Sequence, residues 1–196
     1  EGFADLLANE ADIVMSLREI RLTEERRAKD SGLGDLTDAN RSRVLALDAM
    51  VPITAPGNPV DAISPAVLAR IYAGRVTNWK DLGGPDAPIS LHLRDAKSGL
   101  SQAVQDRLMA PAGLVLESDI TRHLSNKALT QAVTNDPFAI GISSYSETGN
   151  ADVLILTGTC GFSLRAGRVT IKTEDYPLTA PMFLYIPARR LPKLAR

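Results

Sequence analysis

Residues 89–108, ISLHLRDAKSGLSQAVQDRL, decide the fold class. Every second residue from Ile89 to Leu93 is apolar, an alternation typical of a β-strand. Ser98-Gly99 then opens a segment in which Val104 and Leu108 stand four residues apart, as on one face of a helix. The stretch therefore predicts a strand, a loop and a helix in that order.

Comparable units lie on both sides of this stretch. Before it, Ser64 and Pro65 predict a capped helix start, and Gly74 predicts the helix end. After it, Ser125-Asn126 opens another amphipathic helix, and Phe138–Ser143 reads as extended. Strands that alternate with helices of this length indicate an α/β fold with largely parallel sheets.

The ends of the chain predict further short elements. We expect helices over Phe3–Leu7, from Thr23 to Ser31 and within Leu191–Arg196, and strands over Ala11–Met15, Val44–Thr54, Val153–Leu156, Val169–Thr173 and Met182–Ile186. The extended segments near Val44–Thr54 and Asp152–Leu156 would cross between two lobes. We therefore expect residues 1–50 and 150–196 to form an N-terminal lobe and residues 55–148 a second lobe, with a ligand crevice between them.

Composition excludes several classes of protein. The 196 residues are 44% hydrophobic, and 22 Lys and Arg against 23 Asp and Glu give a formal charge of −1. Because these charges are interspersed, a general nucleic-acid binder is not expected. The longest apolar runs are far shorter than the roughly 20 residues that span a bilayer.

Metal and thiol chemistry have little support in the sequence. Cys160 is the single cysteine, and its spacing to His92 and His123 does not resemble a zinc site, so we expect neither metal nor cofactor. A Cys160 thiolate partnered by one of these histidines is an alternative. The composition favours a buried, inert thiol instead.

The segment Leu93–Gly99 is the first candidate anion site, because it ends a predicted strand and begins a helix. Free N–H groups and the positive end of the helix dipole favour an anion at such a point. Ser98 adds a hydroxyl donor, Gly99 permits close backbone approach, and Arg94 offers a planar fork that matches phosphate or carboxylate oxygens. A capped helix with a surface arginine is the alternative.

The segment Met15–Arg18 is a second candidate. Ser16 and Arg18 share one side of an extended chain and could both face the crevice. The alternative is a strand-end turn with a solvated arginine.

Patterns for an enzyme are poor. Ser98 has no nearby histidine in the sequence and no nucleophile-elbow pattern around it. The acidic run Thr173–Tyr176 reads as a solvated turn before a proline. Trp79 could stack on a ligand, but a tryptophan packed under a glycine-closed turn is the more usual arrangement.

The order of short motifs along the chain resembles the phosphate-binding periplasmic proteins of ABC importers. The motifs that carry the resemblance are Ala11–Ser16, Ala46–Val51, Gly57–Val60, Ile71–Gly74, Thr77–Trp79, Leu82–Gly84, Pro88-Ile89, Arg94 with Ser98-Gly99, and Tyr176–Leu178. The Ser16-Leu17-Arg18 form and the run Lys172–Leu178 look closest to a branch fused to outer-membrane protein A-like domains.

This resemblance implies a two-lobed type II binding-protein fold whose lobes are joined by two crossing segments and close on an oxyanion. Arg94, Ser98 and Gly99 match the family's phosphate-contacting loop, and Ser16 matches the serine after its second strand. The implied function is periplasmic, non-enzymatic binding of phosphate or a similar oxyanion for uptake or sensing, with an ABC importer as partner. The alternative is a cell-envelope structural or interaction module with a degenerate fold and no tight ligand.

Three departures from the family pattern stand out. Leu100 replaces a common threonine, so only its N–H remains as a donor, and Leu17 stands where importers often have an acid. The chain also starts after the family's first strand, first helix and two anion loops. We therefore expect weak phosphate binding and association through an incomplete N-terminal lobe.

Overall fold

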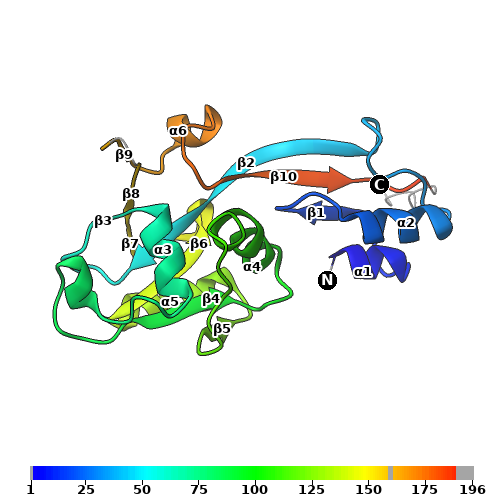
Figure 1. Ribbon diagram of the computed structural model, residues 1–196. Coiled ribbons are helices and arrows are strands. Elements are labelled where there is room, and N and C mark those ends of the chain that lie inside the picture. Colours follow the sequence, from blue (N-terminus) through cyan, green and yellow to red (C-terminus); the bar gives the residue numbers. More distant parts are fainter. Residues whose placement is uncertain (1, 159–160, 189–196) are drawn as a thin grey trace. The chain divides into compact units, whose positions relative to one another are not determined.

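The protein is described by a computed structural model that covers residues 2–158 and 161–188 (Figure 1). The chain divides into unit 1, Glu1–Leu47 with Pro181–Arg196, and unit 2, Asp48–Ala180. It passes from one unit to the other within β2 (Ser42–Thr54) and within β10 (Thr179–Tyr185). The predicted lobes agree with this division near residue 50 and differ from it over residues 150–180, and the lobe boundaries stay a prediction.

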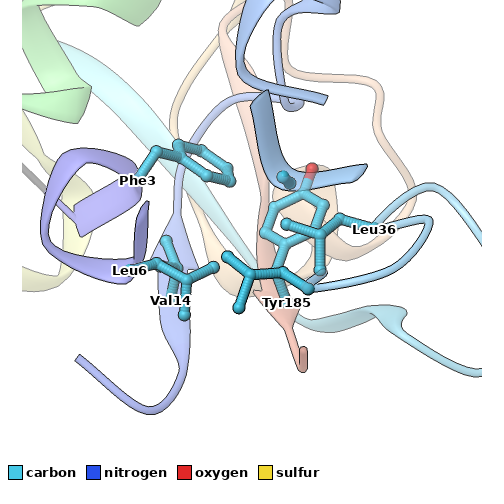
Figure 2. Close-up of a cluster of buried hydrophobic side chains, with 7 residues drawn as sticks. Phe3, Leu6, Val14, Leu36 and Tyr185 are labelled. Atoms are coloured by element: carbon cyan, nitrogen blue, oxygen red, sulfur yellow. The ribbon is translucent and has the colours of Figure 1, made fainter. Parts of the chain in front are cut away.

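Unit 1 combines short helices with antiparallel strands. Its elements besides parts of β2 and β10 are α1 (Gly2–Leu7), β1 (Val14–Ser16) and α2 (Leu22–Asp30). β1 pairs antiparallel with β10, which in turn lies beside β2. The buried side chains of this unit form one cluster, shown in part in Figure 2: Phe3, Leu6, Val14, Ala28, Leu33, Leu36 and Tyr185.

Unit 2 is built around the strand order β2-β6-β4-β5. The strands are β4 (Ser90–Arg94), β5 (Thr121–His123) and β6 (Ala139–Ser144), with β7 (Asp152–Val153) also paired to β2. β4 runs parallel to both β5 and β6, whereas β2 runs antiparallel to β6. This sheet is therefore mixed, and within it the expectation of largely parallel strands holds only for the β6-β4-β5 part.

A smaller sheet and the helices complete unit 2. The sheet has the order β3-β8-β9, and its strands are β3 (Ala62–Ile63), β8 (Ile155–Thr157) and β9 (Ser163–Leu164). The helical elements are α3 (Pro65–Tyr72), the 3₁₀ turn η1 (Trp79–Leu82), α4 (Gly99–Val104), the π-helical turn η2 (Gln105–Met109), α5 (Asn126–Asn135), the 3₁₀ turn η3 (Tyr145–Glu147) and α6 (Arg168–Lys172).

Local sequence signals explain the helix starts. The Ser64 hydroxyl accepts from the Val67 N–H at 3.2 Å, and the Ser125 hydroxyl accepts from the Ala128 N–H at 3.1 Å. Each serine satisfies one N–H that a helix start leaves unpaired. α5 then packs against β4 and β6.

The tryptophan belongs to the core. Trp79 is fully buried, and its indole Nε1 donates to the Phe138 carbonyl at 2.8 Å. Gly83 follows η1 with φ +83°, the left-handed region that favours glycine. This arrangement confirms a packed tryptophan under a glycine-closed turn.

The predicted strand over Val169–Thr173 is wrong, because these residues lie in and just after helix α6. Thr170 Oγ1 donates to the Gly167 carbonyl at 3.1 Å, and Thr173 Oγ1 donates to the Val169 carbonyl at 3.0 Å. The threonine hydroxyls thus bond back to the helical turn, which offsets the strand preference of β-branched residues. The expected last helix in Leu191–Arg196 and the expected burial of Cys160 lie outside the described residues.

Candidate functional site

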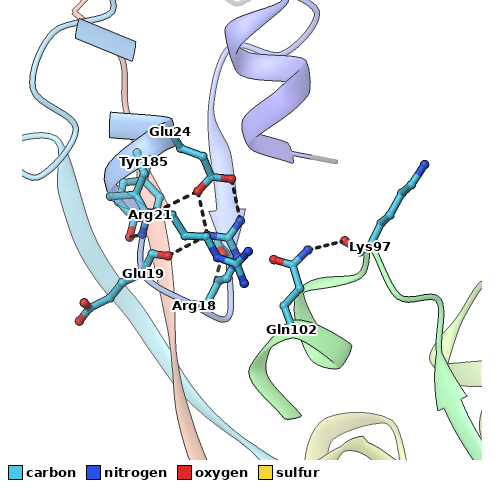
Figure 3. Close-up of polar contacts among 9 residues, drawn as sticks. Arg18, Glu19, Arg21, Glu24, Lys97, Gln102 and Tyr185 are labelled. Carbon is cyan, nitrogen blue, oxygen red and sulfur yellow. Dashed lines mark hydrogen bonds and ion pairs between the residues drawn. The ribbon is translucent and has the colours of Figure 1, made fainter. Parts of the chain in front are cut away.

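The loop between β4 and α4 is held by its own side chains. Asp95 Oδ1 accepts from the Lys97 N–H at 2.9 Å, and Ser98 Oγ accepts from the Ser101 N–H at 3.2 Å. Gln102 Nε2 donates to the Lys97 carbonyl at 3.1 Å, as Figure 3 shows. The loop and the first turn of α4 are therefore fixed by local hydrogen bonds.

This first turn presents donors. The Ser98 hydroxyl oxygen caps the helix by accepting from the Ser101 N–H. Because Gly99 and Leu100 lie in the first turn, their N–H groups have no intrahelical partner. Neither N–H has another acceptor in the part of the chain that the structure describes. The Leu100 side chain is buried, which leaves its N–H as its contribution to the loop.

Arg94, the last residue of β4, has its guanidinium bound to the segment between β5 and α5. Its Nε donates to the His123 carbonyl at 3.2 Å, one terminal nitrogen to the Leu124 carbonyl at 2.9 Å and the other to Asn126 Oδ1 at 3.0 Å. These contacts use three of the five N–H groups of the guanidinium. One N–H remains on each terminal nitrogen, enough for two bonds to an oxyanion.

The three acceptors of Arg94 are all neutral. No carboxylate forms an ion pair with Arg94 within residues 2–158 and 161–188. The positive charge of Arg94 is therefore not neutralised by a direct ionic contact there.

The backbone of Arg94 is held by two further side chains. Its carbonyl accepts from Ser101 Oγ at 2.7 Å and from a terminal nitrogen of Arg122 at 3.0 Å. Arg122 is exposed, which adds a second guanidinium beside the β4–α4 loop. No local sequence pattern points to Arg122, because β5 follows β4 only after a long connection.

His92 and His123 pair with each other across β4 and β5. His92 Nδ1 lies 2.9 Å from His123 Nε2, with the ring planes 16° apart. One ring must donate and the other accept, so at least one imidazole is neutral. Burial lowers the pKa of both rings, and the mutual charge of the pair lowers the pKa of His92 further.

Ser16 and Arg18 lie in unit 1. Ser16 Oγ accepts from the Arg18 N–H at 3.2 Å, and the Arg18 guanidinium forms a two-bond pair with Glu24 at 2.7 and 2.9 Å (Figure 3). Arg18 also lies over the Phe3 ring, 5.1 Å from its centre. Both residues thus have partners in unit 1, and their contact with a ligand stays a prediction.

The described residues contain no group of three or more His, Cys, Asp or Glu placed to hold a metal ion. None of their helices is long and apolar enough to cross a membrane.

Solved structures share this fold. A candidate phosphate ABC transporter substrate-binding protein of Clostridium perfringens, solved with bound phosphate, superposes with a TM-score of 0.79 at 25% identity. The superposition covers 98% of this chain and 72% of that protein. The α/β fold is therefore that of type II binding proteins, of which this chain represents a part, and the predicted fold class is confirmed.

Curated sequences agree with the structural comparison. The phosphate-binding protein PstS of Borreliella burgdorferi is 34% identical over 82 residues, which are 42% of this chain and 29% of the relative. Protein SphX of Synechococcus elongatus is 24% identical over 94% of this chain and 56% of its own length. The chain thus spans about half or less of these two relatives.

The expected resemblance is confirmed by a match that extends over nearly the whole chain. The family model described as the PBP superfamily domain matches residues 1–192, and the chain belongs to that family.

Proposed function

We propose that this domain binds phosphate or a similar oxyanion without catalysing a reaction. In this proposal Arg94 provides the charged contact, Ser98 donates its hydroxyl, and Gly99 and Leu100 donate their N–H groups. One observation carries the proposal. The N–H groups of Gly99 and Leu100 at the start of α4 have no acceptor among the described residues, and Arg94 at the end of β4 keeps one unused N–H on each terminal guanidinium nitrogen. The phosphate in the Clostridium perfringens relative supports it.

The proposed contacts are all donors. An oxyanion can accept from a guanidinium, a hydroxyl and backbone N–H groups at once, and bonds to a charged partner contribute roughly 1.5–3 kcal/mol each. Phosphate that carries a proton also needs an acceptor, and Leu17 stands where importers of the family often have an acid. The contacts named here therefore bind phosphate and sulfate by the same chemistry.

The relatives support a proposal for the wider role. We propose that the protein is periplasmic, that it acts in uptake or sensing, and that an ABC importer is its partner, as the description of the Clostridium perfringens protein suggests. Ser16 is proposed as a further ligand contact from unit 1. The Ser98 hydroxyl is bound to the Ser101 N–H and forms no hydrogen bond with a histidine among the described residues, which supports a non-enzymatic role.

A second candidate function is a cell-envelope module without a tight ligand. The observation in its favour is that Arg94 already has three acceptors within the protein and that Leu100 offers no hydroxyl. Such a module would keep the fold and lose the affinity.

Calorimetric titration with inorganic phosphate, and separately with sulfate, separates the two functions. Arg94→Ala is expected to weaken phosphate binding about 10- to 150-fold, the loss of one charge-assisted bond. Arg70→Ala, which removes an exposed arginine on α3, is the control for net charge and should leave the affinity unchanged. If the unaltered chain shows no heat with either anion up to millimolar concentrations, the second function is favoured.

A further inference from the structure

Asn126, the first residue of α5, is bound at both ends of its side-chain amide. Its Oδ1 accepts from Arg94, and its Nδ2 donates to Glu147 Oε2. A guanidinium only donates and a carboxylate only accepts, so the chemistry of the two partners allows one orientation of the amide. Glu147 therefore determines that the oxygen of Asn126 faces Arg94.

Glu147 is itself fixed from two elements. Its carbonyl accepts from Thr130 Oγ1 of α5 at 3.0 Å and from Ser143 Oγ of β6 at 3.1 Å. The Thr130 side chain also lies against Gly149, where an added Cβ would stand 3.2 Å from its methyl group. The turn that carries Glu147 is thus anchored to the helix and the sheet on which Arg94 depends.

Asn126 is not needed to start its helix. Ser125 provides the cap through its bond to the Ala128 N–H at 3.1 Å. The side-chain amide of Asn126 instead binds Arg94 and Glu147, and the stability of the helix does not require these two contacts.

We propose that Asn126 and Glu147 are positioning residues for Arg94 in oxyanion binding, an inference that rests on the proposed function. Asn126, oriented by Glu147, adds the third bond to those from the His123 and Leu124 carbonyls and so holds the guanidinium in one orientation before the anion arrives. Because the group that touches Arg94 is an uncharged amide, the guanidinium is immobilised without a carboxylate at contact distance to compete with the ligand. Ordering a long side chain in advance removes part of the entropy lost on binding.

The first experiment measures the orientation of Arg94 directly. In protein labelled with ¹⁵N-arginine and free of ligand, the Nη–H signals of Arg94, one of which is bound to Asn126 Oδ1, should be ordered and slow to exchange with water in the unaltered chain. Asn126→Ala should make these signals mobile and leave the Arg122 Nε–H signal unchanged. An Arg94 signal with the same order and exchange rate in the variant would overturn the proposal.

The second experiment measures phosphate affinity by calorimetry. Asn126→Ala should weaken binding about 2- to 10-fold, the cost of ordering one side chain during binding. Gln131→Ala, which removes an exposed amide from the same helix, is the matched control. Glu147→Ala should give a loss of the same size, and the double variant should lose no more than either single one.

Asn126→Asp tests the importance of a neutral partner. The new carboxylate would pair with Arg94, so phosphate binding should fall further than in Asn126→Ala and recover as the pH falls and the carboxyl takes up a proton. A merely structural role of Asn126 predicts no such pH profile.

The outcomes of the titrations distinguish the positioning role from the proposed function. If the unaltered chain binds phosphate and Asn126→Ala binds it equally well, the positioning role is refuted. If the unaltered chain does not bind phosphate at all, the proposed function itself is refuted.

Discussion

At the scale of single residues, Arg18 supports the packing of unit 1. Arg18 and Glu24 form a two-bond pair whose side chains are only 12% and 22% exposed. Burial alone would raise the pKa of Glu24, but the hydrogen bonds from Arg18 and from the Arg21 N–H outweigh it and lower that pKa. The pair therefore links the segment after β1 to α2.

Arg18→Ala is expected to lower the free energy of unfolding by about 1–3 kcal/mol, because Glu24 then loses both bonds to a charged partner. Arg18→Lys should restore only part of this, since an ammonium cannot form the two-bond fork. Chemical denaturation measures both effects. Arg26→Ala, which removes an exposed arginine of α2, is the control, and an equal loss in that variant would contradict the role of the pair.

The histidine pair predicts a dependence of stability on pH. Because the pKa values of His92 and His123 lie below the ordinary 6.5 in the folded state, the unfolded chain binds more protons in mildly acidic solution. The stabilisation from the neutral rings is complete above about pH 6.5 and is lost as the pH falls through the folded-state pKa values.

Denaturation at several pH values tests this dependence. The free energy of unfolding should fall below about pH 6.5, and it should fall less steeply in His123→Gln, which keeps a hydrogen-bonding side chain but titrates one group fewer. Identical slopes in the two proteins would assign the pH dependence to groups other than this pair.

The local sequence was enough to predict Arg94, Ser98 and Gly99 as candidate site residues, because a strand end, a loop and a helix start follow one another directly in this segment. The partners of Arg94 were not predictable in this way. Asn126 and Glu147 come from later elements. Only the pairing of β4 with β5 and the packing of α5 bring Asn126 to the guanidinium and Glu147 to Asn126. A single sequence carries no signal for such contacts.

At the scale of elements, the tight contact between α5 and β6 is set by one glycine. A Cβ on Gly141 would stand 2.8 Å from Val133 Cγ2 and 3.1 Å from Leu129 Cδ2. Both neighbours are buried and belong to α5, so neither can move without shifting the helix.

Gly141→Ala is expected to destabilise unit 2 by about 1–3 kcal/mol through overpacking. The measurement is thermal or chemical denaturation. Gly158→Ala is the control because, among the described residues, its added Cβ would meet only the Phe162 carbonyl, at 3.7 Å. A Gly141→Ala protein as stable as the parent would mean that α5 can move away from the sheet at little cost.

The elements that the sequence predicted well have signals within one turn of chain. α3 and α5 begin where Ser64 and Ser125 cap them, as expected. α6 was not predicted because three of its five residues, Val169 to Ile171, are β-branched and favour a strand. The turn is instead favoured by Gly167 at its start and by the hydroxyls of Thr170 and Thr173, which donate to backbone carbonyls. The relative direction of the strands could not be predicted either, because no local sequence pattern indicates that β2 and β6 run antiparallel.

At the scale of the whole molecule, β1 is the end strand of its sheet among the described residues. Its inner neighbour is β10, and Met15 in its centre is 64% exposed. An exposed edge of this kind favours pairing with another chain.

The 196-residue chain is therefore expected to associate as its concentration rises, and Met15→Lys should weaken this association by placing a charge on the edge. Sedimentation velocity over a concentration series measures both. A parent chain that stays monomeric throughout would show that the edge is protected, and equal association of parent and variant would place the contact elsewhere.

The burial of Trp79 has a spectroscopic consequence. It is the single tryptophan of the chain, and it lies within unit 2. Fluorescence excited selectively at the indole therefore reports the unfolding of unit 2 alone, whereas far-ultraviolet circular dichroism reports both units. Following both signals in the same denaturation distinguishes the unfolding of the two units without an added dye. Superimposable curves would mean that the units unfold in one transition, and separate midpoints would give the stability of each unit.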